Sequence, residues 1–228
     1  MSVNTIASYI DHTLLKPTAT HIDINKICNE ALVYGFAAVC VPPPLVRVAR
    51  SQLYGEQPVV KVATVIGFPF GYSAVAAKLA EVEQAISDGA DELDIVINLV
   101  ALKEGDWALL EEEMRILTLH AHAAGKIVKV IIESGILTDA EIIQCCVVYS
   151  RVGVDFLKTS TGYAERGATV EAVRLMREHL PPAVKIKASG GIRDYASAIA
   201  MVEAGADRLG CSAGVAIVKG EHVGPGGY

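Results

Sequence analysis

The stretch GVDFLKTSTG (residues 153–162) contains the unit that decides the fold of this chain. Gly153 is the residue type that commonly ends a helix, and residues 155–160 follow it as a short strand-like run. Lys158 lies inside this run, although lysine is usually solvated because burying an ammonium ion is costly. A desolvated lysine beside another cation loses its proton and becomes a nucleophilic amine, which would explain a lysine at this position.

The same alternation of strand-like runs and amphipathic helices continues along the chain. Glycines precede several of the runs, as expected where a helix ends and a strand begins: Gly35, Gly89, Gly125, Gly153 and Gly205. The helices expected between them include 75–87, 107–123, 139–151 and 169–180. The predicted strands are 8–12, 37–41, 60–66, 92–98, 127–133, 155–160, 184–189 and 208–212.

Eight strand–helix units in 228 residues predict an α/β fold, a (β/α)₈ TIM barrel. The strand at 8–12 is the weakest of the eight, and an open doubly wound sheet is the alternative. We expect one domain over residues 1–228, with a short flexible tail at about 220–228. The recurring Gly-Ala-Asp (89–91 and 205–207) is interpreted as a mark of helix-to-strand junctions and not as a site.

Composition narrows the class of partner. The chain is 52% hydrophobic with a net charge of −6, and its twenty Lys and Arg are scattered, which argues against nucleic acid. No run is long and apolar enough for a membrane helix, and no secretory signal is visible, so we expect a cytoplasmic protein. The five cysteines are expected to be buried free thiols, since their spacing fits neither a disulfide framework nor a metal site.

Counting by two along each strand predicts which side chains enter the barrel. Asp94 does so from the fourth strand, Lys129 from the fifth, Lys158 from the sixth and Lys187 from the seventh. Lys185 shares the face of Lys187 but lies where it could reach water at the bottom rim. Each alone could be a structural ion pair, but four charges near the strand ends favour an active site.

The repulsion between two neighbouring ammonium groups indicates how such a site would obtain a neutral amine. A free lysine with a pKa of about 10.4 is only about 0.04% neutral at pH 7. Two ammonium groups about 4 Å apart repel by about 4 kcal/mol at an effective dielectric near 20, or about three pKa units. Lys158 and Lys187, on neighbouring strands, are predicted to form such a pair. Asp94 would keep the nearer amine charged.

The loops after the seventh and eighth strands are rich in small residues, as in barrels that bind phosphate there through backbone N–H groups. A short helix is expected at 213–219, and Ser212 would add a hydroxyl. The predicted substrate- and phosphate-binding residues are Gly162, Gly190, Gly191, Gly210 and Ser212.

With these residues in place, the chain resembles the class I, Schiff-base deoxyribose-phosphate aldolase family over nearly its whole length. The similarity lies in DHTLLKP (11–17), AVCV (38–41), ELDIVIN (92–98), KVIIE (129–133), KTSTG (158–162) and KASGG (187–191). The phosphate loop departs from the family's Gly-Thr-Ser-Ser-Gly, because GCSAG (210–214) has one hydroxyl fewer.

The resemblance implies a lyase that reversibly cleaves 2-deoxy-D-ribose 5-phosphate to acetaldehyde and D-glyceraldehyde 3-phosphate, in deoxyribonucleotide and carbohydrate degradation. It implies that Lys158 forms the Schiff base, that Lys187 lowers its pKa and joins proton transfer, and that Asp94 is the acid/base group. Tyr228 matches the family's terminal tyrosine. No cofactor or metal is expected, because the imine supplies the electrophile. The partners are then small sugar phosphates and aldehydes.

Several alternatives stay open. Asp11 either joins the proton network or anchors the first strand, and Lys129 either pairs with Asp94 or contacts substrate. Cys40 is an inert core thiol unless it is exposed. The rival functions are another lysine-dependent barrel aldolase, such as a transaldolase-like enzyme, a metal-dependent barrel enzyme, or a non-catalytic sugar-phosphate-binding barrel. A homo-oligomer, with a dimer favoured, is expected from the pairing habits of barrels of this size.

Overall fold

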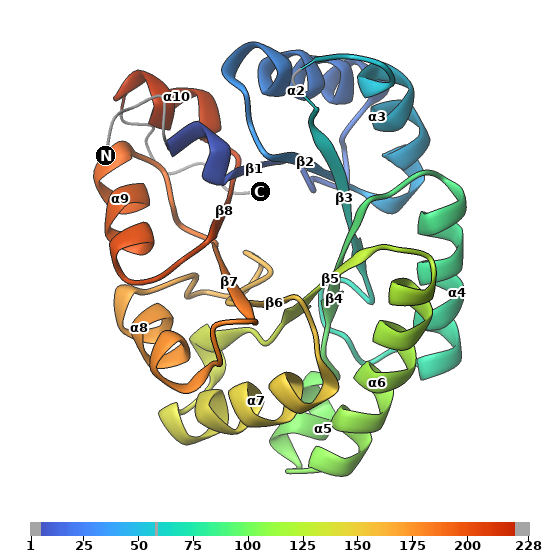
Figure 1. The fold of residues 1–228 in the computed structure, drawn as a ribbon, viewed down its shortest axis with the longest axis vertical. Coiled ribbons are helices and arrows are strands. Elements are labelled where there is room, and N and C mark those ends of the chain that lie inside the picture. The colour runs from blue at the N-terminus through green and yellow to red at the C-terminus, as the bar shows by residue number, and fades with distance from the viewer. Residues whose placement is uncertain (1–5, 58, 222–228) are drawn as a thin grey trace.

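Eight parallel strands close into a barrel in sequence order, with β1 paired to β8, as the sequence predicted. The computed structural model describes residues 6–57 and 59–221. Figure 1 shows the helices arranged in a ring around the strands. The strands are β1 (Ile10–Thr13), β2 (Ala38–Val41), β3 (Lys61–Ile66), β4 (Glu92–Val96), β5 (Ile127–Ile131), β6 (Phe156–Lys158), β7 (Lys185–Ser189) and β8 (Arg208–Cys211).

The helices connect successive strands along the outside. Two of those predicted, 75–87 and 107–123, have the expected bounds, and the others differ by one or two residues. The α-helices are α2 (His21–Tyr34), α3 (Val46–Leu53), α4 (Val75–Ser87), α5 (Leu99–Lys103), α6 (Trp107–Ala123), α7 (Asp139–Val152), α8 (Val170–His179), α9 (Tyr195–Glu203) and α10 (Gly214–Lys219). Short 3₁₀ turns are η1 (Ala7–Tyr9), η2 (Pro43–Leu45) and η3 (Ser134–Ile136).

Every predicted strand is shorter or shifted in the structure, by at most two residues at either end, and the first and sixth differ most. The first begins at Ile10 and not at residue 8, because Ala7–Tyr9 forms a 3₁₀ turn. The sixth ends at Lys158, although the Thr159 N–H still donates to the Lys187 carbonyl. The backbone therefore leaves the sheet directly after the lysine, at the carboxyl end of the barrel.

The Gly-Ala-Asp junctions act as the sequence indicated. Each glycine that ends a helix adopts a left-handed φ, for example 81° at Gly153. The aspartate that follows accepts a hydrogen bond from a backbone N–H of the preceding strand. Asp91 does so from Val62, and Asp207 from Ile186. The repeat therefore fixes neighbouring strands to one another, which makes it a feature of the fold.

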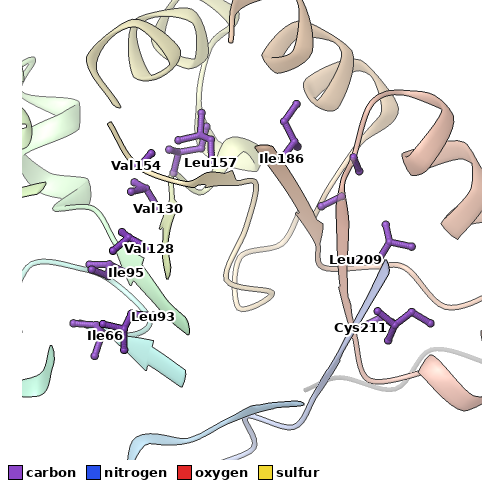
Figure 2. Packing of buried hydrophobic residues seen from close by; sticks show 14 of the residues in the cluster. Ile66, Leu93, Ile95, Val128, Val130, Val154, Leu157, Ile186, Leu209 and Cys211 are labelled. Carbon is purple, nitrogen blue, oxygen red and sulfur yellow. The ribbon is translucent and has the colours of Figure 1, made fainter. Parts of the chain in front are cut away.

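Alternation along the strands separates two environments. Figure 2 shows Leu93 and Ile95 of β4, Val130 of β5 and Ile186 of β7 in the apolar layer that lies under the helices. Their neighbours in sequence point the other way, into the barrel. The hydrophobic layer thus fixes strand register, and register fixes which charged side chains meet inside.

One buried ion pair lies outside the barrel interior. Lys78 of α4 donates to Glu113 of α6 over 2.9 Å and to the Val96 carbonyl at the end of β4 over 2.8 Å. Both charged side chains are at most 2% exposed. The pair joins two helices to the strand that carries Asp94.

Candidate active site

The four charged residues predicted to enter the barrel meet inside it. Asp94 and Lys129 are register partners on β4 and β5, and Lys158 and Lys187 are partners on β6 and β7. All four are buried, with at most 2% of each residue exposed. Lys185 is exposed at the start of β7, as expected for a lysine at the bottom rim.

Asp94 is the hub of this cluster. Its Oδ2 accepts hydrogen bonds from Lys158 Nζ at 2.8 Å and Lys187 Nζ at 2.7 Å, and its Oδ1 accepts one from Lys129 Nζ at 2.8 Å. Burial alone would raise the pKa of the carboxyl group, but the three surrounding ammonium groups hold it well below its usual range. Asp94 is therefore an anion in the free protein.

The two amines that share this oxygen differ in their surroundings. Burial lowers the pKa of Lys158; Asp94 opposes that shift and the charge of Lys187 adds to it. Burial also disfavours the charge of Lys187, but Asp11 and Asp94 together raise its pKa well above the ordinary value. The neighbouring cation was expected to be the main cause of the lowered pKa of Lys158, whereas desolvation is the larger cause.

Asp11 and Lys129 complete the inner contacts. Lys187 Nζ lies 2.6 Å from Asp11 Oδ2, and Lys129 Nζ lies 2.6 Å from Glu92 Oε2. Burial works against the charge of Asp11, yet its cationic neighbours lower its pKa to about 2. Lys129 also pairs with Asp94, which was one of its two expected roles, and its carboxylate partners raise its pKa despite burial.

Two members of the cluster were missed from the sequence. Glu92 precedes Asp94 by two residues on β4 and therefore shares its face, and it pairs with Lys129. Arg208, at the start of β8, pairs with Asp11 and with Glu92. Counting by two would have placed Glu92 inside. Polar residues that begin a strand usually reach water, so neither was singled out.

A polar pocket lies at the carboxyl ends of the last strands, next to Lys187. Its volume is about 140 Å³, and all five residues predicted to bind phosphate line it: Gly162, Gly190, Gly191, Gly210 and Ser212. Arg193 also lines this pocket, together with Glu165, and was missed because backbone N–H groups were expected to bind the phosphate. A Cβ at Gly210 would lie 3.0 Å from Lys187 Cε, so the pocket adjoins that lysine.

The remaining sequence expectations have different outcomes. All five cysteines are buried free thiols, and burial raises the pKa of Cys40. Cys40 is therefore an inert thiol in this structure. Tyr228 lies outside the described residues.

Within residues 6–57 and 59–221, no group of three His, Cys, Asp or Glu is placed to hold a metal ion, and no helix is long and apolar enough to cross a membrane.

A closed parallel barrel whose interior gathers amines and carboxylates beside an anion-sized pocket places the chain among TIM-barrel enzymes. Residues 5–220 match the model of the DeoC/LacD family of aldolases. The chain belongs to this family and is an enzyme of the lyase class.

Curated relatives agree along nearly the whole chain. A deoxyribose-phosphate aldolase of Thermococcus gammatolerans is 52% identical over 215 residues, which is 94% of this chain and 96% of the relative. That of Thermococcus kodakarensis is 50% identical over 96% of this chain and 98% of the relative. The solved structure of the tetrameric Aeropyrum pernix deoxyribose phosphate aldolase has a TM-score of 0.86 and 33% identity, covering 96% of this chain and 91% of that one.

Proposed function

We propose that this chain is a class I aldolase that reversibly cleaves 2-deoxy-D-ribose 5-phosphate into acetaldehyde and D-glyceraldehyde 3-phosphate. One observation carries the proposal. A buried amine with a lowered pKa, that of Lys158, shares one carboxylate oxygen with a second amine that keeps its charge. A neutral amine is the nucleophile that Schiff-base chemistry requires.

The first step joins the amine to the open-chain sugar. Lys158 Nζ attacks C1, and loss of one water from the carbinolamine gives a protonated imine. Asp94 Oδ2 lies within hydrogen-bond distance of this nitrogen, so it can hold the imine proton and orient the bond. The pocket at Gly190 and Gly210 would hold the phosphate, with Arg193 as a cationic side chain at its wall.

Cleavage follows from the cationic imine, which is an electron sink. A base takes the proton of the C3 hydroxyl, the C2–C3 bond breaks, and its electrons form an enamine with Lys158. C3 leaves as the aldehyde carbon of glyceraldehyde 3-phosphate. Protonation at C2 and addition of one water then release acetaldehyde and regenerate the amine. Asp94 and Lys187, through a water, are the groups that we assign to these proton transfers.

Borohydride reduction in the presence of acetaldehyde tests the covalent step. We expect an ethyl group on Lys158, found by peptide mass mapping and lost in Lys158→Ala. Lys185→Ala is the matched control, because Lys185 is exposed on the neighbouring strand, and it should leave the adduct unchanged. An adduct on another lysine, or none, contradicts the assignment.

Substrate profiling separates the rivals. Turnover with acetaldehyde as the preferred donor supports the proposal, whereas transfer of a dihydroxyacetone unit supports a transaldolase-like enzyme. Binding of deoxyribose 5-phosphate without turnover or a trapped imine would indicate a sugar-phosphate-binding barrel. Activity lost with EDTA and restored by a divalent ion would indicate metal-dependent chemistry.

We also propose a homo-oligomer, with a dimer favoured, acting in the cytoplasm. The pairing of barrels of this size through their outer helices supports the dimer, while the Aeropyrum pernix relative is described as tetrameric. Light scattering after size-exclusion chromatography distinguishes the two assemblies. Fractionation of the producing cells tests the location.

A further inference from the structure

Ion pairs join seven ionisable side chains inside the barrel into one continuous network, within the part of the chain that the structure describes. Its members come from six strands and include three acids and four bases. The acids are Asp11, Glu92 and Asp94, and the bases are Lys129, Lys158, Lys187 and Arg208. With every group charged, the network would carry four positive and three negative charges, a net charge of +1.

A buried net charge is costly, so the network favours a state in which one base is neutral. Arg208 cannot be that base, because a guanidinium group does not lose its proton in proteins. Lys129 and Lys187 each lie near at least two carboxylates, whereas within residues 6–57 and 59–221 Lys158 has an ion pair with Asp94 alone. Charge balance therefore selects Lys158 as the neutral amine.

Arg208 contributes to this balance from the far end of the barrel. It begins β8, and its guanidinium pairs with Asp11 and with Glu92, the latter at 3.1 Å. It lines a surface depression at the amino-terminal rim together with Phe156 and Lys185. The proposed substrate pocket lies at the opposite, carboxyl ends of the strands, so Arg208 acts on the site through charge and not through contact.

We infer that Arg208 and Glu92 are positioning residues that set the protonation state of Lys158 through the charge balance of the barrel interior. The consequence for turnover rests on the proposed function, but the consequence for the amine does not depend on any reaction. Loss of the Arg208 charge leaves a net charge of −1 when Lys158 is neutral, which favours the ammonium form. Loss of the negative charge of Glu92 has the opposite effect and favours the neutral form of Lys158.

Other titratable groups also face this amine. The charges of three groups act on Lys158: Asp94 from β4, Lys187 from β7 and, when ionised, Cys40 from β2. The charge of Lys158 in turn acts on Glu133, which follows β5. Burial raises the pKa of the Cys40 thiol, which therefore adds no charge. The Glu133 carboxylate accepts a 2.5 Å hydrogen bond from Thr161, and no ion pair joins it to the network in the described residues.

The test is the pH dependence of Lys158 acylation by traces of acetic anhydride, which reacts with the neutral amine. Peptide mass spectrometry quantifies the label against the denatured protein. The pH profile of kcat/KM is measured on the same samples. One charge about 10 Å away changes a pKa by about one unit at an effective dielectric near 20.

Opposite shifts are expected from the two single variants. Arg208→Met should raise the acylation midpoint by about one pH unit and lower kcat/KM about tenfold below the midpoint. Glu92→Gln should lower the midpoint by a similar amount. In the double variant Arg208→Met/Glu92→Gln, the network is again neutral when Lys158 is neutral, so the acylation midpoint should return close to its original value. Arg208→Lys keeps the positive charge and should leave the midpoint unchanged.

Arg115→Met is the matched control, because Arg115 is an exposed arginine on α6 paired with Glu112. It should leave the midpoint unchanged. Midpoints that stay fixed in both single variants, or that move in the same direction, would overturn the inference. Should Arg208→Met fail to fold, the sign of the Glu92→Gln shift decides alone. Acylation reports the amine even if the protein cleaves no sugar phosphate, so the two proposals fail separately.

Discussion

Lys158 and Lys187 donate hydrogen bonds to the same atom, Asp94 Oδ2, over 2.8 and 2.7 Å. Only Lys187 has a second carboxylate, that of Asp11, within ion-pair distance in the described residues. In a desolvated interior, two ammonium groups that share one acceptor repel each other, so keeping both charged costs free energy. The better-paired amine stays cationic, and the other becomes available as a nucleophile.

Removal of the charged Lys187 should therefore make Lys158 a much poorer nucleophile. In Lys187→Leu, we expect kcat/KM at pH 7 to fall on the order of a hundredfold, because Lys158 then stays an ammonium ion. The free energy of unfolding should fall by about 3 kcal/mol, since two buried carboxylates lose a partner. Steady-state kinetics and urea denaturation measure both. The control is Lys26→Leu, whose side chain is 73% exposed, and full activity in Lys187→Leu would contradict the assigned role.

Acid should destabilise the protein through Asp11. Burial opposes its charge, but Lys187, Lys129 and Arg208 outweigh that effect and lower its pKa to about 2 in the folded state. A carboxyl group with a depressed folded pKa contributes stability above its unfolded pKa of about 3.9, and that contribution is lost as the pH falls. Stability should therefore decline between about pH 4 and about pH 2.

The variant Asp11→Asn isolates this contribution. Its urea midpoint at pH 7 should be lower than that of the unaltered chain, and its decline between about pH 4 and about pH 2 should be shallower. Asp139→Asn, at an exposed position that begins α7, serves as the control with an unaltered slope. Parallel curves for Asp11→Asn and the unaltered chain would show that Asp11 is not stabilised as an anion.

Arg193 should distinguish phosphorylated from unphosphorylated substrates. It lines the pocket formed by Gly190 and Gly210, and a hydrogen bond to a charged group is worth about 1.5–3 kcal/mol. Arg193→Met should raise KM for deoxyribose 5-phosphate about tenfold or more and leave kcat/KM for deoxyribose nearly unchanged. Arg174→Met, an exposed change on α8, is the control. Equal losses on both substrates would argue against a phosphate contact.

For the buried pair of Lys78 and Glu113, removal of one partner should cost more stability than replacement of both. Lys78→Met leaves a carboxylate without its cation and should cost about 3–5 kcal/mol of unfolding free energy. The double variant Lys78→Met/Glu113→Leu should regain most of that loss. Removal of Arg115, which forms an exposed ion pair with Glu112, should change the unfolding free energy far less. Urea denaturation checks all three, and a double variant no more stable than the single would contradict this account.

Much of the fold and part of the site could be predicted from the chain itself. Glycines such as Gly153 marked the helix ends, and alternation placed Asp94, Lys129, Lys158 and Lys187 inside the barrel. These features are local, so short windows of sequence contain them. Four pocket residues, Gly190, Gly191, Gly210 and Ser212, followed from their position at the carboxyl ends of the last two strands, whereas Arg193 was missed.

Contacts across the barrel could not be predicted in the same way. Which amine reaches Asp11 depends on the tilt and stagger of strands that are far apart in sequence. The ranking of causes behind the pKa of Lys158 depends on burial, which only the closed barrel defines. Arg208 escaped notice for the same reason, because a residue that begins a strand reveals nothing about a carboxylate 197 positions away.

That long-range contact has a consequence for biosynthesis. Asp11 emerges from the ribosome early, while Arg208 is translated 197 residues later. A nascent chain that lacks its final strand cannot close the barrel, and its Asp11 lacks Arg208, one of the cations that stabilise the carboxylate inside the fold. The catalytic interior can therefore close only after translation has passed β8.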